Sequence, residues 1–234
     1  MGRGQHDARR DVHLHSPASP SPPMVGEQLR LSSPVFVHVI DDDKAVRESL
    51  GDLLRSMDYQ ISLHASASEF LNVELPDAPA CLVLDVRLPD ISGLALQEHL
   101  TRADTRLPVI LMTGFGDIPM SVKGMKAGAV DFLTKPIRDQ DLLDAVAAAI
   151  RIDQRRRQEV GQIAELQERY ALLTPRERQV MALIASGLMN KQAATELSIS
   201  EFTVKLHRSS AMRKLKTRSV ATLARMAEVL GIQR

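Results

Sequence analysis

Five short apolar runs alternate with five amphipathic segments between residues 35 and 150. The runs fall at 35–40, 60–64, 81–86, 108–112 and 130–133, and the helix-like segments fall at 45–57, 67–75, 93–103, 118–127 and from Asp139 onward. This alternation predicts a five-stranded parallel sheet with helices on both faces, because parallel strands need crossover helices. In a doubly wound sheet of this kind, the ligand crevice lies beyond the carboxyl ends of the strands.

Acidic and polar side chains follow the ends of four of these runs. Along the chain they are Asp41 and Asp42, then Asp85, then Thr113, and finally Lys135. Three carboxylates at one sheet edge repel each other unless a cation lies between them, and oxygen ligands suit Mg²⁺. A carboxylate neutralised by a metal can attack a phosphoryl group, while a lysine and a hydroxyl stabilise the phosphoryl oxygens. The pattern therefore predicts a magnesium-dependent phosphoryl-accepting site.

Charge divides the chain into two unlike parts, although the net charge is only +1. Residues 35–150 hold 10 basic and 18 acidic side chains, whereas residues 171–234 hold 11 basic and 4 acidic ones. The basic part predicts a polyanionic partner, most simply nucleic acid. The single cysteine fits a reducing compartment, and no apolar run is long enough to cross a bilayer. We expect a cytoplasmic protein with no membrane partner.

The sequence divides into four segments. Residues 1–34 are rich in Pro and Ser and are predicted to be a disordered arm, residues 35–150 form the α/β domain, residues 151–170 form a helical linker, and residues 171–234 form an all-α domain. Four helices are expected in the last domain, at 175–186, 190–197, 201–215 and 219–230. Two short helices joined by a tight turn, the second of them basic, are typical of a helix-turn-helix reader of DNA.

Residues 35–145 resemble the receiver domain of bacterial two-component response regulators. The resemblance rests on four stretches, at 39–43, 84–93, 112–114 and 126–136. It implies a flavodoxin-like fold in which Asp85 takes phosphate from a phosphohistidine on a sensor histidine kinase.

The same resemblance implies roles for the residues around Asp85. Mg²⁺ would be held by Asp42, Asp85 and the backbone carbonyl of Arg87, with Asp41 acting through water. Thr113 and Lys135 would bind phosphoryl oxygens. Phe132 falls at the aromatic switch position, where the ring turns inward on phosphorylation, although plain core packing would also explain a phenylalanine there.

Residues 172–230 resemble the helix-turn-helix domain of the LuxR/NarL class. The resemblance rests on four stretches of sequence, at 173–180, 187–194, 203–208 and 213–215. With the receiver and the helical linker, the chain is most similar to FixJ-type regulators, notably the TodT/StyR group. The resemblance implies three further partners, namely promoter DNA, RNA polymerase and a second copy of the chain on phosphorylation.

The helix from Glu201 would enter the major groove. Lys205 and Arg208 would face base edges, and phosphates would be held by Lys191, Thr203, Lys214 and Lys216. His207 would either touch DNA or form a hydrogen bond within the domain. Val204, Leu206 and Leu215 are expected in the core.

Three other classes of function fit this sequence less well than a transcription regulator does. A haloacid-dehalogenase-type enzyme needs a second Asp two residues after the nucleophile, and Arg87 stands there. A sensor of small lactones needs an aromatic-lined pocket before the reader, where the receiver lies and where Trp is absent. An adaptor that binds no nucleic acid does not fit the basic C-terminal segment. We therefore expect a non-enzymatic regulator, switched by dimerisation or by unmasking of the reader.

Overall fold

The computed structural model describes residue 1 and residues 34–103, 105–114 and 118–232. The predicted N-terminal arm, apart from its two end residues, lies outside the described residues. Side chains are described from residue 122 onward in the helix that begins at Ile118.

Five parallel strands form a single sheet in the order β2-β1-β3-β4-β5. The strands are β1 (Phe36–Ile40), β2 (Gln60–His64), β3 (Ala80–Asp85), β4 (Val109–Thr113) and β5 (Asp131–Thr134). All six residues of β3 are buried, as expected for a central strand covered on both faces. The strand order reverses between β1 and β3, so the crevice of a doubly wound sheet is expected at the ends of these two strands.

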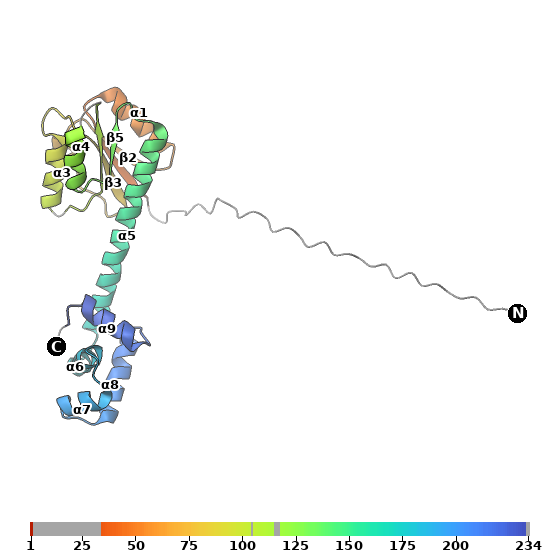
Figure 1. Ribbon diagram of the computed structural model, residues 1–234, viewed down its shortest axis with the longest axis vertical. Helices are drawn as coiled ribbons and strands as arrows, with labels where there is room; N and C mark the ends of the chain where they lie inside the picture. Colours follow the sequence, from red (N-terminus) through yellow and green to blue (C-terminus); the bar gives the residue numbers. More distant parts are fainter. Residues whose placement is uncertain (2–33, 104, 115–117, 233–234) are drawn as a thin grey trace. The chain divides into compact units, whose positions relative to one another are not determined.

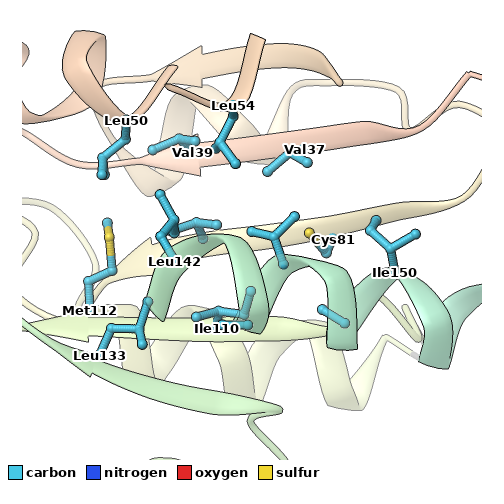
Figure 2. Packing of buried hydrophobic residues seen from close by; sticks show 14 of the residues in the cluster. Val37, Val39, Leu50, Leu54, Cys81, Ile110, Met112, Leu133, Leu142 and Ile150 are labelled. Atoms are coloured by element: carbon cyan, nitrogen blue, oxygen red, sulfur yellow. The ribbon is translucent and has the colours of Figure 1, made fainter. Parts of the chain in front are cut away.

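Two layers of helices cover the sheet, as Figure 1 shows. The helices α1 (Lys44–Arg55) and α5 (Asp139–Ala171) pack on one face, and α2 (Ala67–Leu71), α3 (Gly93–Arg102) and α4 (Ile118–Lys126) pack on the other. Figure 2 shows Leu142 and Ile150 of α5 and Leu50 and Leu54 of α1 against the strands. The predicted doubly wound fold is confirmed.

The helix α2 is shorter than the sequence pattern predicts. It ends at Leu71 rather than at residue 75. Asn72 is the C-cap residue, and its side-chain amide donates to the carbonyl oxygen of Ser68, a contact that competes with continued helix. Pro76 disfavours helical backbone only at the residue before it, Leu75.

The long helix α5 continues through Gly161 without a break. Its first half buries Leu142, Val146 and Ile150 against the sheet. Its second half contributes Leu166 to a separate apolar cluster formed by the C-terminal helices. Within residues 154–165 no side chain is fully buried, so the middle of this helix lacks a packed face within the described chain.

The C-terminal domain holds four short helices, namely α6 (Pro175–Ala185), α7 (Asn190–Leu197), α8 (Glu201–Lys214) and α9 (Val220–Val229). Thr174 and Glu177 form a reciprocal capping box at the start of α6. Ser198 takes a left-handed conformation in the turn between α7 and α8, and Ser200 caps α8. The predicted helix-turn-helix architecture is confirmed.

One core prediction in this domain is wrong. Val204 and Leu215 are fully buried as expected, but the side chain of Leu206 is 55% exposed. Two residues along a helix correspond to a rotation of about 200°, so Leu206 lies on the face opposite Val204.

Candidate functional site

Three carboxylates meet at the carboxyl ends of β1 and β3. Asp41 directly follows β1, Asp42 comes next, and Asp85 is the last residue of β3. One oxygen from each carboxylate lies within 4.8 Å of the other two, which is a spacing that a single cation can bridge. Asp41 and Asp85 are buried, whereas Asp42 is exposed, so the cluster opens toward solvent on one side.

Lys135 brings a positive charge into the cluster from the loop after β5. Its Nζ donates to Oδ2 of Asp41 at 2.6 Å and to Oδ2 of Asp85 at 2.5 Å. Burial raises the pKa of Asp41, and the Lys135 ammonium only partly offsets this effect. Burial alone would lower the pKa of Lys135, but its hydrogen bonds to Asp41 and Asp85 leave that pKa raised. One ammonium against three carboxylates leaves the cluster short of positive charge.

Backbone groups orient both buried carboxylates. The N–H of Arg87 donates to Oδ1 of Asp85 at 2.9 Å, and the N–H of Asp43 donates to Oδ1 of Asp41 at 3.0 Å. Asp85 is therefore held at one oxygen by a backbone N–H and at the other by Lys135. Asp43 caps α1 through the N–H groups of Ala45 and Val46, which fixes the loop that carries the acidic pair.

Thr113 and Phe132 lie on the neighbouring strands. The hydroxyl of Thr113 is buried at the end of β4 and has no hydrogen-bond partner among the described residues. Such a hydroxyl needs a polar ligand, because a buried polar group without a partner is costly. Phe132 is half-buried on β5, pairs with Leu111 of β4 and packs against the core on the α3 face.

A basic hollow lies along α8 and the loop that follows it. Its volume is about 610 Å³, and it is lined by Lys205, Arg208, Ser209, Met212, Arg213, Lys216, Thr217 and Arg218. Arg208 donates to Oδ1 of Asn190 at 3.1 Å, which ties this guanidinium to the preceding helix α7. Five of the eight lining residues are cationic, so the hollow matches the charge of a polyanion.

The predicted DNA-binding residues differ in their surroundings. Lys191, Lys205 and Lys216 are exposed, whereas Thr203, His207 and Arg208 are half-buried. Arg213 belongs to the basic helix that the sequence predicts as the DNA reader, but the sequence predicts no DNA contact for Arg213 or Arg218. The 3–4-residue spacing of Lys205, Arg208 and Met212 places these residues on one face of α8, and this face lines the hollow. Lys216 follows in the loop after the helix.

Lys214 has partners inside the domain rather than a free ammonium. Its Nζ donates to Oε2 of Glu177 at 2.7 Å and to the carbonyl oxygen of Leu172 at 3.1 Å. Burial works to raise the pKa of Glu177, but hydrogen bonds from Lys214, Ser210 and the backbone of Thr174 lower that pKa to about 2. Lys214 therefore neutralises the buried carboxylate of Glu177. This ion pair competes with the phosphate contact that the sequence predicts for Lys214.

Among the described residues, no helix has both the length and the apolar character needed to span a bilayer.

Comparison with known families identifies both domains. The response regulator receiver domain matches residues 37–147, and the luxR family of bacterial regulatory proteins matches residues 171–227. The chain belongs to the DNA-binding response regulators of the FixJ/NarL class, which regulate transcription and are not enzymes.

Particular relatives support the same assignment. Nodulation protein W of Bradyrhizobium diazoefficiens is 49% identical over 207 residues, which cover 88% of this chain and 91% of that protein. Response regulator protein TodT of Pseudomonas putida is 46% identical over 194 residues, with coverages of 83% and 86%. The low-resolution structure of response regulator StyR matches with a TM-score of 0.74 at 45% identity and covers 84% of this chain and 99% of that one. The predicted similarity to the TodT/StyR group is confirmed.

Proposed function

We propose that Asp85 is the phosphoacceptor through which a sensor histidine kinase controls DNA binding by this regulator. The observation that carries the proposal is the setting of Asp85, a buried carboxylate held by Lys135 and the Arg87 N–H at the edge that also carries Asp41 and Asp42. A carboxylate oxygen of Asp85 attacks phosphorus, and the bond from phosphorus to the donor imidazole breaks. The imidazole nitrogen leaves with the electron pair.

The acidic cluster fits Mg²⁺. Asp41, Asp42, Asp85 and the backbone carbonyl of Arg87 would hold the ion, because hard oxygen donors suit it and the single ammonium of Lys135 leaves the cluster negative. When bound, Mg²⁺ would neutralise the carboxylates so that a phosphoryl group, itself an anion, can approach.

Thr113, Lys135 and Phe132 would read the phosphorylated state. The buried Thr113 hydroxyl would donate to a phosphoryl oxygen and gain the partner that it lacks among the described residues. Lys135 would shift from the carboxylates to the phosphoryl oxygens, which carry more charge. Phe132 is only half-buried, so its ring could bury more surface by turning inward when Thr113 moves.

The proposed DNA reader is α8 with the basic hollow. Lys205 and Arg208 would face base edges, whereas Lys191, Thr203 and Lys216 would contact phosphates. Arg213 and Arg218 would add to this phosphate-binding surface, since they line the same hollow. Lys214 is left out of the proposed surface because Glu177 already holds it. His207 would touch DNA or bond within the domain.

The proposed setting is the bacterial cytoplasm, with the kinase, promoter DNA and RNA polymerase as partners. Residues 35–150 would act as the receiver, 151–170 as the linker and 171–234 as the reader. Phosphorylation would make two receivers pair, so that two linked readers bind a double site more tightly through effective concentration.

Solution mass and DNA affinity test this proposal together. With Mg²⁺ and beryllofluoride, which mimics a phosphoryl group, we expect the protein to change from monomer to dimer and to bind a duplex selected from a random-sequence library more tightly. Light scattering and fluorescence anisotropy measure the two effects. A loaded protein that stays monomeric but binds more tightly would replace dimerisation by unmasking. Equal DNA affinity with and without beryllofluoride would contradict phosphorylation control.

Two lysines of the hollow should respond differently to substitution. Lys205→Ala should weaken binding to the selected duplex by about 1–3 kcal/mol and blur its preference at one base pair, because a base contact is lost. Lys216→Ala should weaken binding to all duplexes alike and reduce the salt slope by about 1, because a phosphate contact is lost. Binding titrations at several salt concentrations separate the two. Lys44→Ala, at an exposed position on α1, is the matched control. Identical behaviour of both variants would refute the assignment of roles.

A further inference from the structure

Asp153 of α5 is a charged residue in a buried position. Its side chain is only 1% exposed, and it accepts a hydrogen bond from the backbone N–H of Ala80 at 3.1 Å. Arg156 donates to its Oδ1 through Nη2 at 2.5 Å and Nε at 3.1 Å, and Arg157 Nε donates to its Oδ2 at 2.7 Å. Arg157 also reaches Oδ1 of Asp77 at 2.5 Å. We call these five residues the Asp153 cluster.

The cluster joins two elements that are also joined at the phosphoacceptor. Strand β3 begins at Ala80 and ends at Asp85, and α5 begins at Asp139, four residues after Lys135, and includes Asp153. The pair of Asp85 and Lys135 links the end of the strand to the loop that leads into the helix. The pair of Ala80 and Asp153 links the strand to the helix itself at the opposite edge of the sheet, where the strand begins.

The position of the cluster along α5 is equally specific. Asp153 follows the buried residues Ala149 and Ile150 by one helical turn. Beyond it, residues 154–165 include no fully buried side chain until Leu166 joins the C-terminal core. Asp153 is therefore the last buried attachment to the receiver before the exposed stretch of the helix.

A buried ionic cluster is a poor way to gain stability alone, since well-packed apolar side chains often do as well or better. The directional hydrogen bonds of the cluster instead fix how α5 is rotated about its axis and in which direction it leaves the sheet. Apolar contacts, in contrast, are non-directional and tolerate small slips. A leucine at position 153 would also leave the N–H of Ala80 without this acceptor.

We propose that the Asp153 cluster positions the linker helix where it leaves the receiver, so that the phosphorylation state of the receiver reaches the DNA reader. This inference rests on the proposed function, because it needs phosphorylation at Asp85 to alter DNA binding. Asp153 acts as a positioning residue and touches neither the phosphoryl group nor DNA. Loss of the cluster uncouples the two sites while each keeps its own chemistry.

The test uses full-length Asp153→Asn beside Asp144→Asn. Asp144 lies on the same helix but is exposed, and its Oδ1 accepts a hydrogen bond from Gln140 Nε2 at 2.9 Å. In Asp153→Asn we expect normal beryllofluoride uptake and normal DNA affinity without it. The gain in DNA affinity on loading should fall toward none, from the roughly 5- to 150-fold typical of allosteric coupling. Amides 154–165 should exchange hydrogen faster. Asp144→Asn should match wild type in every readout.

An unchanged gain in Asp153→Asn would overturn the inference, because a merely stabilising cluster would leave the gain intact. If that variant does not fold, Arg157→Gln supplies the same readouts, since the Arg157 side chain is 30% exposed and its loss removes the bonds to Asp153 and Asp77. If wild type itself shows no gain, the proposed function fails and the inference fails with it. A wild-type gain that persists unchanged in both variants rejects the inference alone.

Discussion

The Asp85→Asn variant is expected to bind DNA with the same affinity in the presence and absence of a phosphoryl donor. An amide nitrogen replaces one carboxylate oxygen, so the side chain loses its charge and its ability to form an acyl phosphate at pH 7. If wild type gains the roughly 5- to 150-fold that allosteric coupling usually provides, the ratio for the variant should be about 1. Anisotropy titrations with acetyl phosphate and Mg²⁺ measure the ratio, and intact-mass spectrometry counts the phosphoryl groups bound.

The matched control is Asp52→Asn on α1, where the exposed carboxylate accepts from Arg55 and lies outside the acidic cluster. This variant should take up one phosphoryl group and show the wild-type gain. Removal of Mg²⁺ by a chelator should prevent uptake in both wild type and control, because the cluster would again repel the anionic donor. A phosphoryl group found by peptide mapping on Asp41 or Asp42 of Asp85→Asn, with the DNA gain preserved, would show that Asp85 is not the acceptor.

The geometry of the acidic cluster follows from the sequence because it depends on strand ends. Parallel strands place their carboxyl ends at one edge, so the positions of Asp41, Asp85 and Lys135 after three apolar runs are enough to bring them together. The order of the strands and the orientation of each carboxylate do not follow in this way. The hydrogen bond from the Arg87 N–H to Asp85 is a local contact, of the kind that aspartates often make with the backbone two residues on. The bonds from Lys135 to Asp41 and Asp85 span 94 and 50 residues, and these contacts require the folded sheet.

Charged residues that pair across long sequence separations cannot be predicted from the local sequence pattern. Glu177 and Lys214 form an ion pair although they are 37 residues apart in the sequence. The residues that flank Lys214 in the sequence do not distinguish it from an exposed lysine of a DNA-binding helix. Asp153 likewise looks like an ordinary polar residue of a linker helix in the sequence, because Ala80, whose N–H donates to it, lies 73 residues away. Such pairs become visible only when the tertiary structure shows which charges are buried.

The pair His38 and His64 shows the same limit in the core. Their ring nitrogens Nδ1 and Nε2 lie 3.3 Å apart across β1 and β2, and both rings meet Phe70 edge-on. Burial, with a smaller contribution from His64, lowers the pKa of His38 to about 4, so this histidine is neutral at pH 7. The sequence shows only a histidine inside an apolar run, and the pairing of β1 with β2 is what turns it into half of a buried pair.

Gly93→Ala is expected to have the second large effect, because Gly93 lies against the backbone that carries the phosphoacceptor. A Cβ at this first residue of α3 would lie 2.3 Å from the carbonyl oxygen of Asp85 and 2.9 Å from Cα of Val86. Alanine favours a helix over glycine by about 1 kcal/mol, but the clash is with backbone, which cannot turn away as a side chain can. The overpacking should destabilise the receiver by about 1–3 kcal/mol or more.

Gly161→Ala is the control, because this glycine-to-alanine change is expected to stabilise the protein rather than destabilise it. Gly161 lies within α5, and a Cβ there meets no atom within 4 Å, so alanine should stabilise this helix by roughly 0.5–1 kcal/mol. Hydrogen exchange of the buried amides of β3 reports opening of the receiver, and acetyl phosphate kinetics report the state of Asp85. In Gly93→Ala we expect faster exchange in β3 and slower phosphorylation together, since relief of the clash must move the end of the strand that bears Asp85. A Gly93→Ala protein as protected and as readily phosphorylated as wild type would show that α3 can shift as a unit without disturbing the acceptor.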